Sequence, residues 1–356
     1  MPPSSASRVP SRSTRPTGWF AFRVARHAIT LGAAVAACIA VAAPAASQIP
    51  GLSGTLVITN KSPSTASIID VGSGRMLATL PTGQGPHEVI LSSDGRTAVV
   101  TDYSGQPGKT LTVIDIPGKR VVRTIDLGDY RRPHGIVFLP GDSIVVVTSE
   151  QSGNVLLVDI RAGIVRRAIP TTQKGSHMVG VTADARHAFT GNMGSNTVSE
   201  LDLRDGSFIR LWDVPATPEA INVTPDGAEV WVGSNTTGKI SVLRPATGEI
   251  TTAAEGFGWP YRVLFTPDRS TVLLPDLKNE VLRFLDRATH RELGRIDFPG
   301  GAPQGITITP DGRYALESLS GQARVAIIDV AARTVVGYLA AGETPDGIAY
   351  TSRVSR

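Results

Sequence analysis

The sequence predicts an all-β fold, a seven-bladed β-propeller whose blades are four-stranded antiparallel sheets. Residues 85–102, GPHEVILSSDGRTAVVTD, recur in seven related copies spaced 42 to 47 residues apart. This period is typical of a four-stranded propeller blade. Each copy also contains short runs rich in β-branched residues, bounded by Gly, Pro, Asn and Asp, which indicates strands joined by turns.

Each copy opens with a short anchor, at which we expect the innermost strand of a blade to begin. The first residues of the seven anchors are Pro86, Pro133, Ser176, Pro218, Pro260, Pro303 and Pro345. In the first complete copy, the predicted strands cover residues 88–91, 97–101, 110–116 and 120–127. Asp-Gly pairs between the first two strands favour tight turns, because Asp bonds to nearby backbone and Gly accepts a positive φ.

The second strand of each copy ends in a polar residue. We align these ends at Asn60, Asp102, Ser149, Asn192, Ser234, Asp276 and Ser318. The strands resemble the Tyr-Val-Thr-Asn repeat of the YVTN family of seven-bladed β-propellers, within the lactonase-like group. The resemblance covers nearly all of residues 54–352 and implies the propeller fold. It implies no single function, because the same propeller carries many unrelated sites.

The two ends of the repeated region are complementary. The region begins with a second strand at residues 55–59 and ends with a lone first strand at residues 347–351. We therefore expect the N- and C-terminal strands to share one blade, with the C-terminal strand innermost. Such a shared blade removes the open ends of the ring.

Residues 1–47 differ from the rest of the chain and are predicted to be a signal peptide. They carry five arginines and no acidic residue, followed by an alanine-rich apolar run at residues 28–43. This pattern is typical of a cleaved leader and is too short for a permanent membrane span. Residues 48–53 then form a short N-terminal segment and residues 54–352 the propeller. We expect a periplasmic or secreted monomer without a membrane span; the alternative is a lipoprotein anchored through Cys38.

The charge balance disfavours a nucleic-acid partner. The whole chain has 35 basic and 31 acidic residues, and without the five leader arginines the balance is 30 to 31. A near-neutral mature chain lacks the basic surplus of a typical nucleic-acid-binding protein. We expect the partner to be a small molecule or a protein.

The predicted connectivity gathers the second residues of the anchors at one mouth of the central channel. Successive strands of a blade run in opposite directions, so all seven anchors start at the same face. The residues expected to encircle this mouth are His87, His134, His177, Glu219, Tyr261, Gln304 and Asp346. Three of the six histidines in the chain therefore occupy one position in consecutive copies.

Three imidazoles beside a carboxylate make a candidate site for a divalent transition metal ion. The predicted ligands are His87, His134, His177 and Glu219, because imidazole and carboxylate suit zinc, iron, copper or manganese. The alternative is structural, with anchor histidines that form hydrogen bonds to backbone carbonyls between blades. The sequence leaves both interpretations open.

A second group of residues is expected to line the same mouth and to contact a small anionic or carbonyl-bearing ligand. The candidates are Glu88, Asp102, Tyr261, Arg262, Gln304 and Asp346. The guanidinium of Arg262 would recognise a carboxylate through two parallel hydrogen bonds. The alternative for each residue is an ordinary solvated loop position.

The leading functional interpretation is an exported YVTN-type propeller that binds a small ligand, a metal ion or a protein partner at the histidine-bearing mouth. The resemblance to the lactonase-like group implies a second one, an enzyme that hydrolyses or eliminates at an ester or lactone. In that enzyme Arg262 would stabilise the oxyanion, while His134, His177 and Glu219 would act as bases or metal ligands. The sequence contains no nucleophile elbow, phosphate loop or haem-attachment motif, and whether the chain is an enzyme stays open.

Overall fold

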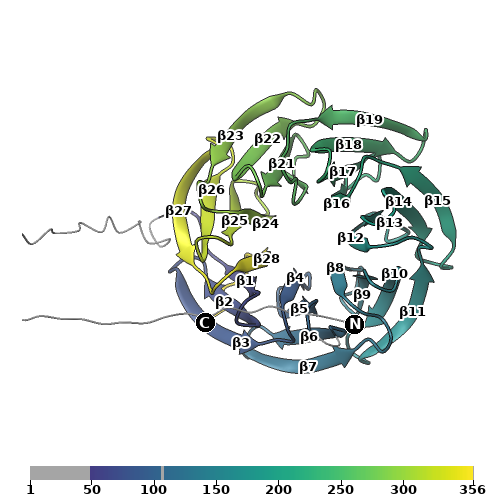
Figure 1. Cartoon of the computed structure of the whole chain (residues 1–356). Helices are drawn as coiled ribbons and strands as arrows, with labels where there is room; N and C mark the ends of the chain where they lie inside the picture. The colour runs from purple at the N-terminus through teal and green to yellow at the C-terminus, as the bar shows by residue number, and fades with distance from the viewer. Residues whose placement is uncertain (1–48, 106–107, 356) are drawn as a thin grey trace, which may run out of the picture. The chain divides into compact units, whose positions relative to one another are not determined.

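The structure, a computed structural model, describes residues 49–105 and 108–355. These residues form seven sheets of four antiparallel strands arranged in a ring, which confirms the predicted seven-bladed β-propeller (Figure 1). The predicted leader at residues 1–47, including Cys38, lies outside the described residues. Within the described ranges, no helix has the length and apolar character needed to cross a membrane.

All blades have the same construction, with the first strand at the inner rim and the fourth at the outside of the ring (Figure 1). Blade 1 contains, from the inside outward, β28 (Pro345–Thr351), β1 (Thr55–Asn60), β2 (Thr65–Asp70) and β3 (Arg75–Pro81). Blade 2 contains β4 (Pro86–Leu91), β5 (Thr97–Asp102), β6 (Thr110–Asp115) and β7 (Arg120–Asp126). Blade 3 contains β8 (Pro133–Phe138), β9 (Ile144–Ser149), β10 (Asn154–Asp159) and β11 (Ile164–Pro170).

The other four blades continue the series around the ring. Blade 4 contains β12 (Ser176–Val181), β13 (His187–Asn192), β14 (Thr197–Asp202) and β15 (Phe208–Asp213). Blade 5 contains β16 (Pro218–Val223), β17 (Val230–Ser234), β18 (Lys239–Arg244) and β19 (Glu249–Ala254). Blade 6 contains β20 (Leu264–Phe265), β21 (Thr271–Asp276), β22 (Val281–Asp286) and β23 (Glu292–Asp297). Blade 7 contains β24 (Pro303–Ile308), β25 (Tyr314–Leu319), β26 (Arg324–Asp329) and β27 (Thr334–Ala340).

The hydrophobic core lies between neighbouring blades. Every residue of β1 is buried, whereas the outermost strand β3 of the same blade is largely exposed. One apolar cluster joins Val99 and Leu111 of blade 2 to Val145 and Val147 of blade 3. Because each blade buries an apolar face on each neighbour, the ring is held together by the same hydrophobic contacts that hold stacked sheets together.

Blade 1 closes the ring as the sequence predicts. The C-terminal strand β28 pairs antiparallel with the N-terminal strand β1, and Ile348 lies opposite Ile58. The hydroxyl of Thr55 donates to the carbonyl of Arg353 at 2.7 Å and accepts from the backbone N–H of Ser355 at 2.9 Å. The two ends of the described chain are thus tied to each other through both backbone and side chains.

A bulge near the start of the inner strand recurs in most blades and determines what faces the channel. In blade 2, Pro86 pairs with Asp102 and Val89 pairs with Val100, so two residues of β4 lie opposite one residue of β5. The same irregularity occurs in β8, β12 and β24. Because a bulge breaks the strict alternation of side chains, two consecutive anchor residues can both point into the channel.

The strand register corrects the alignment of the last copy. Pro303 of blade 7 pairs with Leu319 and not with Ser318, so Leu319 takes the position that a polar residue takes in the other blades. Glu317 then occupies a position that is apolar in most blades, and its side chain lies on the same side of β25 as the buried Ala315 and Leu319. A carboxyl group is therefore buried in the interface between blades 6 and 7.

Candidate functional site

Three imidazole rings from consecutive inner strands stack at one mouth of the channel. His87, His134 and His177 are the second residues of β4, β8 and β12, which lie side by side at the inner rim (Figure 1). The ring centroid of His134 is 3.9 Å from that of His87 and 3.6 Å from that of His177, while the two outer rings are 6.5 Å apart. The predicted gathering of the anchor histidines thus has a definite geometry, with His134 in the middle.

Carboxylates hold the two outer histidines. Nδ1 of His87 lies 2.8 Å from Oδ2 of Asp346 and 3.1 Å from Oε1 of Glu88. Nδ1 of His177 lies 2.8 Å from Oε2 of Glu150. A carboxylate acceptor requires the proton on Nδ1, so in a neutral ring Nε2 keeps a free lone pair.

The central histidine has a different environment. His134 is completely buried, and neither of its ring nitrogens has a hydrogen-bond partner among the described residues. Burial lowers the pKa of His134 well below its usual value, and the nearby His177 and His87 lower it further. The middle ring is therefore neutral and keeps both a donor and an acceptor unused.

Neighbouring charges shift the pKa values of His87 and of its partner Asp346. Burial acts to lower the pKa of His87, but the charge of Asp346 and its hydrogen bond outweigh burial and raise the pKa. Burial acts to raise the pKa of Asp346, but His87 and Lys61, whose Nζ is 2.7 Å from Oδ2, hold it well below its usual range. The carboxylate of Asp346 thus favours the protonated form of His87, and the ammonium of Lys61 lies beside the pair.

An ion pair spans the channel from blade 6 to blade 2. Arg262 donates from Nη2 to Oε1 of Glu88 and from Nη1 to the carbonyl of Tyr261 at 2.7 Å. Burial acts to raise the pKa of Glu88, but the guanidinium of Arg262 and the contact with His87 together outweigh burial and lower the pKa. The hydroxyl of Tyr261 donates to Oδ1 of Asp346 at 3.1 Å. These contacts join the blades on opposite sides of the mouth into one buried network.

The remaining wall of the mouth is formed around Glu219 of blade 5. Its Oε2 accepts from Nε1 of Trp259 at 2.9 Å and from Nδ2 of Asn235. Its Oε1 lies 3.9 Å from Nε2 of His177, too far for a hydrogen bond. Trp259 is 37% exposed, so it borders the opening to solvent.

Tyr103, from the loop after β5, borders the imidazoles. Its ring makes edge contacts with His87 and His134, at centroid distances of 5.2 and 5.1 Å. Its hydroxyl donates to Oε2 of Glu150 at 2.9 Å, and the guanidinium of Arg132 lies over its ring at 4.8 Å. Tyr103 thus adds an aromatic wall to the histidine-bearing mouth.

One group of possible metal ligands stands out in the described part of the chain. His87, Glu88 and His134 each offer one donor atom, and these atoms lie within 4.8 Å of one another. His87 and His134 belong to the metal set expected from the sequence. The third donor of this group is Glu88 and not His177 or Glu219. The latter two residues belong to blades 4 and 5.

Two sequence candidates, Asp102 and Gln304, are not part of this group of three donors. Asp102 ends β5, where its carboxylate accepts from the backbone N–H of Gly83 at 3.0 Å and from the hydroxyls of Thr110 and Thr112 at 2.7 and 2.9 Å. These contacts join strands and loops of one blade. Gln304 is buried at the ring position of blade 7, and its Oε1 has no partner among the described residues.

Two buried or partly buried charged residues near the channel, Lys61 and Glu317, are not predicted from the sequence. Lys61 directly follows the polar end of the second strand in blade 1, a position that points toward the mouth in a blade completed by the C-terminal strand. Glu317 was hidden by the one-residue error in the alignment of the last copy. Burial raises its pKa well above the usual range, and Arg262 only partly opposes this.

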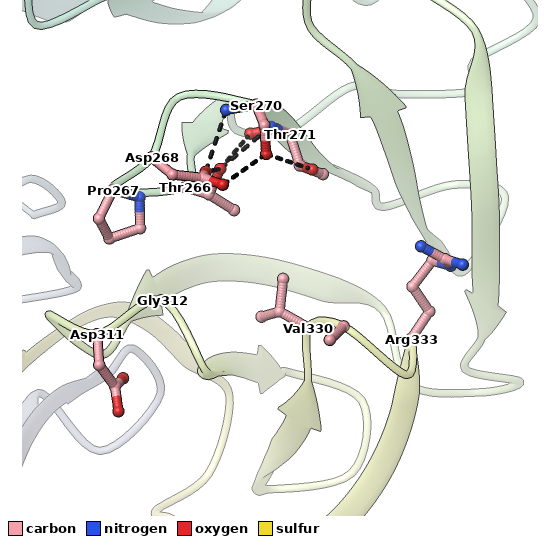
Figure 2. A pocket seen from close by; sticks show the side chains of 10 residues that line it. Thr266, Pro267, Asp268, Ser270, Thr271, Asp311, Gly312, Val330 and Arg333 are labelled. Atoms are coloured by element: carbon pink, nitrogen blue, oxygen red, sulfur yellow. Dashed lines mark hydrogen bonds between the residues drawn. The ribbon is translucent and has the colours of Figure 1, made fainter.

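A cavity of about 290 Å³ lies elsewhere in the molecule, at turns of blades 6 and 7 (Figure 2). Two of its hydroxyl groups are engaged by their own turn: those of Thr266 and Ser270 donate to Asp268 at 2.5 and 2.8 Å. Such local bonds stabilise the turn backbone. These two hydroxyls are therefore already satisfied, in contrast to the ring nitrogens of His134 at the mouth.

Comparison with known proteins supports the fold. No protein-family profile and no curated protein matches the sequence. Hydrazine synthase of Kuenenia stuttgartiensis matches with a TM-score of 0.70 at 18% identity, covering 78% of this chain and 93% of that one. A functionally unknown protein from Desulfotomaculum acetoxidans matches with a TM-score of 0.70 at 16% identity, covering 84% and 99%.

A third solved structure, named as a "putative 6-phosphogluconolactonase" from Bacteroides fragilis, matches with a TM-score of 0.66 at 14% identity, covering 84% of this chain and 98% of that one. At such low identities these similarities establish the propeller fold and nothing about activity. The resemblance to the YVTN family stays a prediction from the repeat.

Proposed function

We propose that this chain is an exported propeller that binds a small anionic or carbonyl-bearing ligand at the histidine-bearing mouth. The observation that carries the proposal is the unpaired state of the buried His134 ring. A buried polar group without a partner costs about 1–3 kcal/mol. A ligand that accepts from one ring nitrogen, or binds to the other, would recover that free energy.

The charges around the mouth support an anionic or carbonyl-bearing ligand. Lys61 and Arg132 lie around the stack, and each of them pairs with a carboxylate, Asp346 and Glu150, that also contacts an outer histidine. Trp259 and Tyr103 supply aromatic walls. A site of this kind, with a few convergent polar groups and aromatic sides, is typical of small-molecule binding.

The experiment is a titration monitored by long-range ¹H–¹⁵N spectra of the histidine rings. The probes are acetate, phosphate, gluconate and glucono-δ-lactone, first with EDTA and then with equimolar Zn²⁺ already present. At least one probe should shift the rings of His87, His134 and His177 while leaving His187 and His290 unchanged. If every probe leaves the three mouth rings unshifted in both buffers, the proposal is wrong.

The lactonase-like alternative requires a guanidinium that is free to stabilise an oxyanion. Arg262, its candidate, is already paired with Glu88 and with the carbonyl of Tyr261. The alternative therefore needs this pair to open when a substrate binds. Hydrolysis of glucono-δ-lactone above the spontaneous rate, lost in Arg262→Met, would favour the enzyme over the binding protein.

A further inference from the structure

We propose that His87, Glu88 and His134 bind one divalent first-row transition metal ion, and that this ion receives the ligand of the mouth. This inference rests on the proposed function and identifies the group to which the ligand binds. It also changes the ligand set expected from the sequence, because Glu88 replaces Glu219 as the carboxylate.

The donor geometry carries the inference. One donor atom each from His87, Glu88 and His134 lies within 4.8 Å of the other two, and all three residues are buried. Metal ions of this class hold nitrogen and oxygen donors at about 2.0–2.2 Å, which places neighbouring donors about 3–4 Å apart. Small side-chain movements would therefore bring the three donors around one ion.

The neighbours of these donors support the same conclusion. A histidine that binds a metal ion usually donates its other ring N–H to a carboxylate, which fixes the ring and makes it a better ligand. His87 has such a partner in Asp346, at 2.8 Å from Nδ1. Glu88 is held in turn by Arg262, so the carboxylate is fixed by a contact from the opposite side of the channel.

His134 supplies the second, independent observation. A ring that is completely buried and has neither nitrogen paired is costly to keep, unless something binds it. Coordination to a metal ion through one nitrogen would satisfy the lone pair of the neutral ring. His177, stacked on the other side, has its own carboxylate partner in Glu150 and is not needed as a ligand.

Two imidazole nitrogens and one carboxylate oxygen suit a first-row transition ion better than calcium or magnesium, which prefer oxygen donors. Three protein ligands also leave coordination positions open. A carboxylate or carbonyl oxygen of the ligand would occupy an open position, which explains why a neutral, buried ring lies at the centre of a ligand-binding mouth.

The experiment uses the full chain purified without a polyhistidine tag and stripped with EDTA. Equilibrium dialysis against Zn²⁺, followed by elemental analysis, should give one equivalent of bound zinc. Asp346 is a partner of a ligand, and loss of such a partner lowers metal affinity about 10- to 100-fold. Asp346→Asn should therefore lower the affinity for zinc by about that factor. His134→Gln and Glu88→Gln remove ligands themselves and should each lower it by more, at least about 100-fold.

Matched variants separate this site from the alternatives. His187→Gln is the control, because Nδ1 of His187 also pairs with a carboxylate, Oε1 of Glu200 at 3.3 Å, but outside the mouth. It should bind zinc like the parent chain. Glu219→Gln should also keep full affinity; if it loses zinc while Glu88→Gln keeps it, the ligand set proposed here is wrong.

A measurement on the unmutated chain covers the case in which a buried variant fails to fold. Binding of Co²⁺ should broaden the ring signals of His87 and His134 and leave those of His187 and His290 sharp. Absence of stoichiometric Zn²⁺ or Co²⁺ binding would overturn the metal site. Shifts of the mouth rings by an organic probe in EDTA would in that case still support the proposed function.

Discussion

Replacement of Asp102 by Asn should stabilise the protein at neutral pH, although the carboxylate makes several hydrogen bonds. Burial raises the pKa of Asp102 from 3.8 to about 6, with the bonds from Thr110, Thr112 and Gly83 only partly opposing the shift. In blade 1 the same position is Asn60, whose oxygen accepts from the N–H of Gly342 at 3.0 Å. One blade of the same propeller thus already has Asn at the equivalent position, with its side-chain oxygen hydrogen-bonded.

The geometry of Asn60 shows that the amide fits this site. Its Nδ2 donates to the hydroxyls of Thr65 and Ser67 at 3.0 and 2.9 Å. In blade 2 the equivalent positions are Thr110 and Thr112, whose hydroxyls contact Asp102. Asn192 in blade 4 donates to Thr197 and Ser199 in the same way, at 3.1 and 2.9 Å. The amide introduced by Asp102→Asn would therefore keep the hydrogen bonds and remove a buried charge.

The size and sign of the effect follow from the pKa of Asp102. A carboxyl group with a raised pKa in the folded state binds its proton more tightly there. The free energy of unfolding therefore falls as pH rises from the unfolded-state pKa of that group through its folded-state pKa. The rise from 3.8 to about 6 corresponds to a loss of about 3 kcal/mol. The parent chain should lose up to this amount between about pH 4 and pH 8 through Asp102, and Asp102→Asn should not.

The assay is urea unfolding at about pH 4 and about pH 8, monitored by circular dichroism. Asp276→Asn is the control at the same repeat position in blade 6. Its carboxylate accepts from the N–H groups of Gly258, Trp259 and Asn279 at 2.8 to 3.2 Å, so an amide there would face donors. That variant should lose about 1.5–3 kcal/mol. If Asp102→Asn is as destabilised as Asp276→Asn at neutral pH, the reasoning about Asp102 is refuted.

Three further predictions concern the buried charges of the mouth and its neighbourhood. Arg262→Met should cost about 3–5 kcal/mol, because it leaves Glu88 buried without its partner, and Arg262→Met/Glu88→Gln should recover part of that loss in urea unfolding. Glu317→Leu should raise the melting temperature, because it replaces an unpaired buried carboxyl with an apolar side chain; a lower melting temperature would contradict its burial among apolar neighbours. The pair of His87 and Asp346 should stabilise the fold most below about pH 6.5, and this contribution should fall as pH rises through the raised pKa of His87; Asp346→Asn should remove that part of the pH dependence.

The fold could be predicted almost completely because the repeat constrains it many times over. In the first complete copy, each observed strand boundary lies within two residues of its predicted position. Blades 6 and 7 are exceptions. The inner strand of blade 6 begins at Leu264 and not at the anchor Pro260, which forms only an isolated bridge with Asp276. In blade 7, the predicted alignment of Glu317-Ser318-Leu319 is one residue out of register. In the other blades, the second strand ends in a polar residue that usually follows a Thr or a small residue. Ser318 is both polar and small, so from the sequence alone it could be either of these two residues.

The gathering of the three anchor histidines could also be predicted, whereas their partners could not. Connectivity alone places His87, His134 and His177 on neighbouring blades. It does not reveal that Arg262 reaches Glu88 from the other side of the channel, 174 residues away along the chain. Contacts across a ring depend on the channel diameter and on which side chains are long enough to span it, and neither property is encoded in the repeat period.

The asymmetry of the mouth follows from the residue that occupies the second bulge position in each blade. In blade 3 this residue is Gly135, where an added Cβ would lie 2.6 Å from the backbone nitrogen of Val179. The missing side chain lets the inner strands of blades 3 and 4 approach closely, and this approach accompanies the 3.6 Å stacking of His134 on His177. In blades 2 and 6 the same position holds Glu88 and Arg262, which pair with each other across the channel. One repeat thus produces an imidazole stack on one side of the mouth and an ion pair across it, because the bulge gives most blades two consecutive residues at the channel.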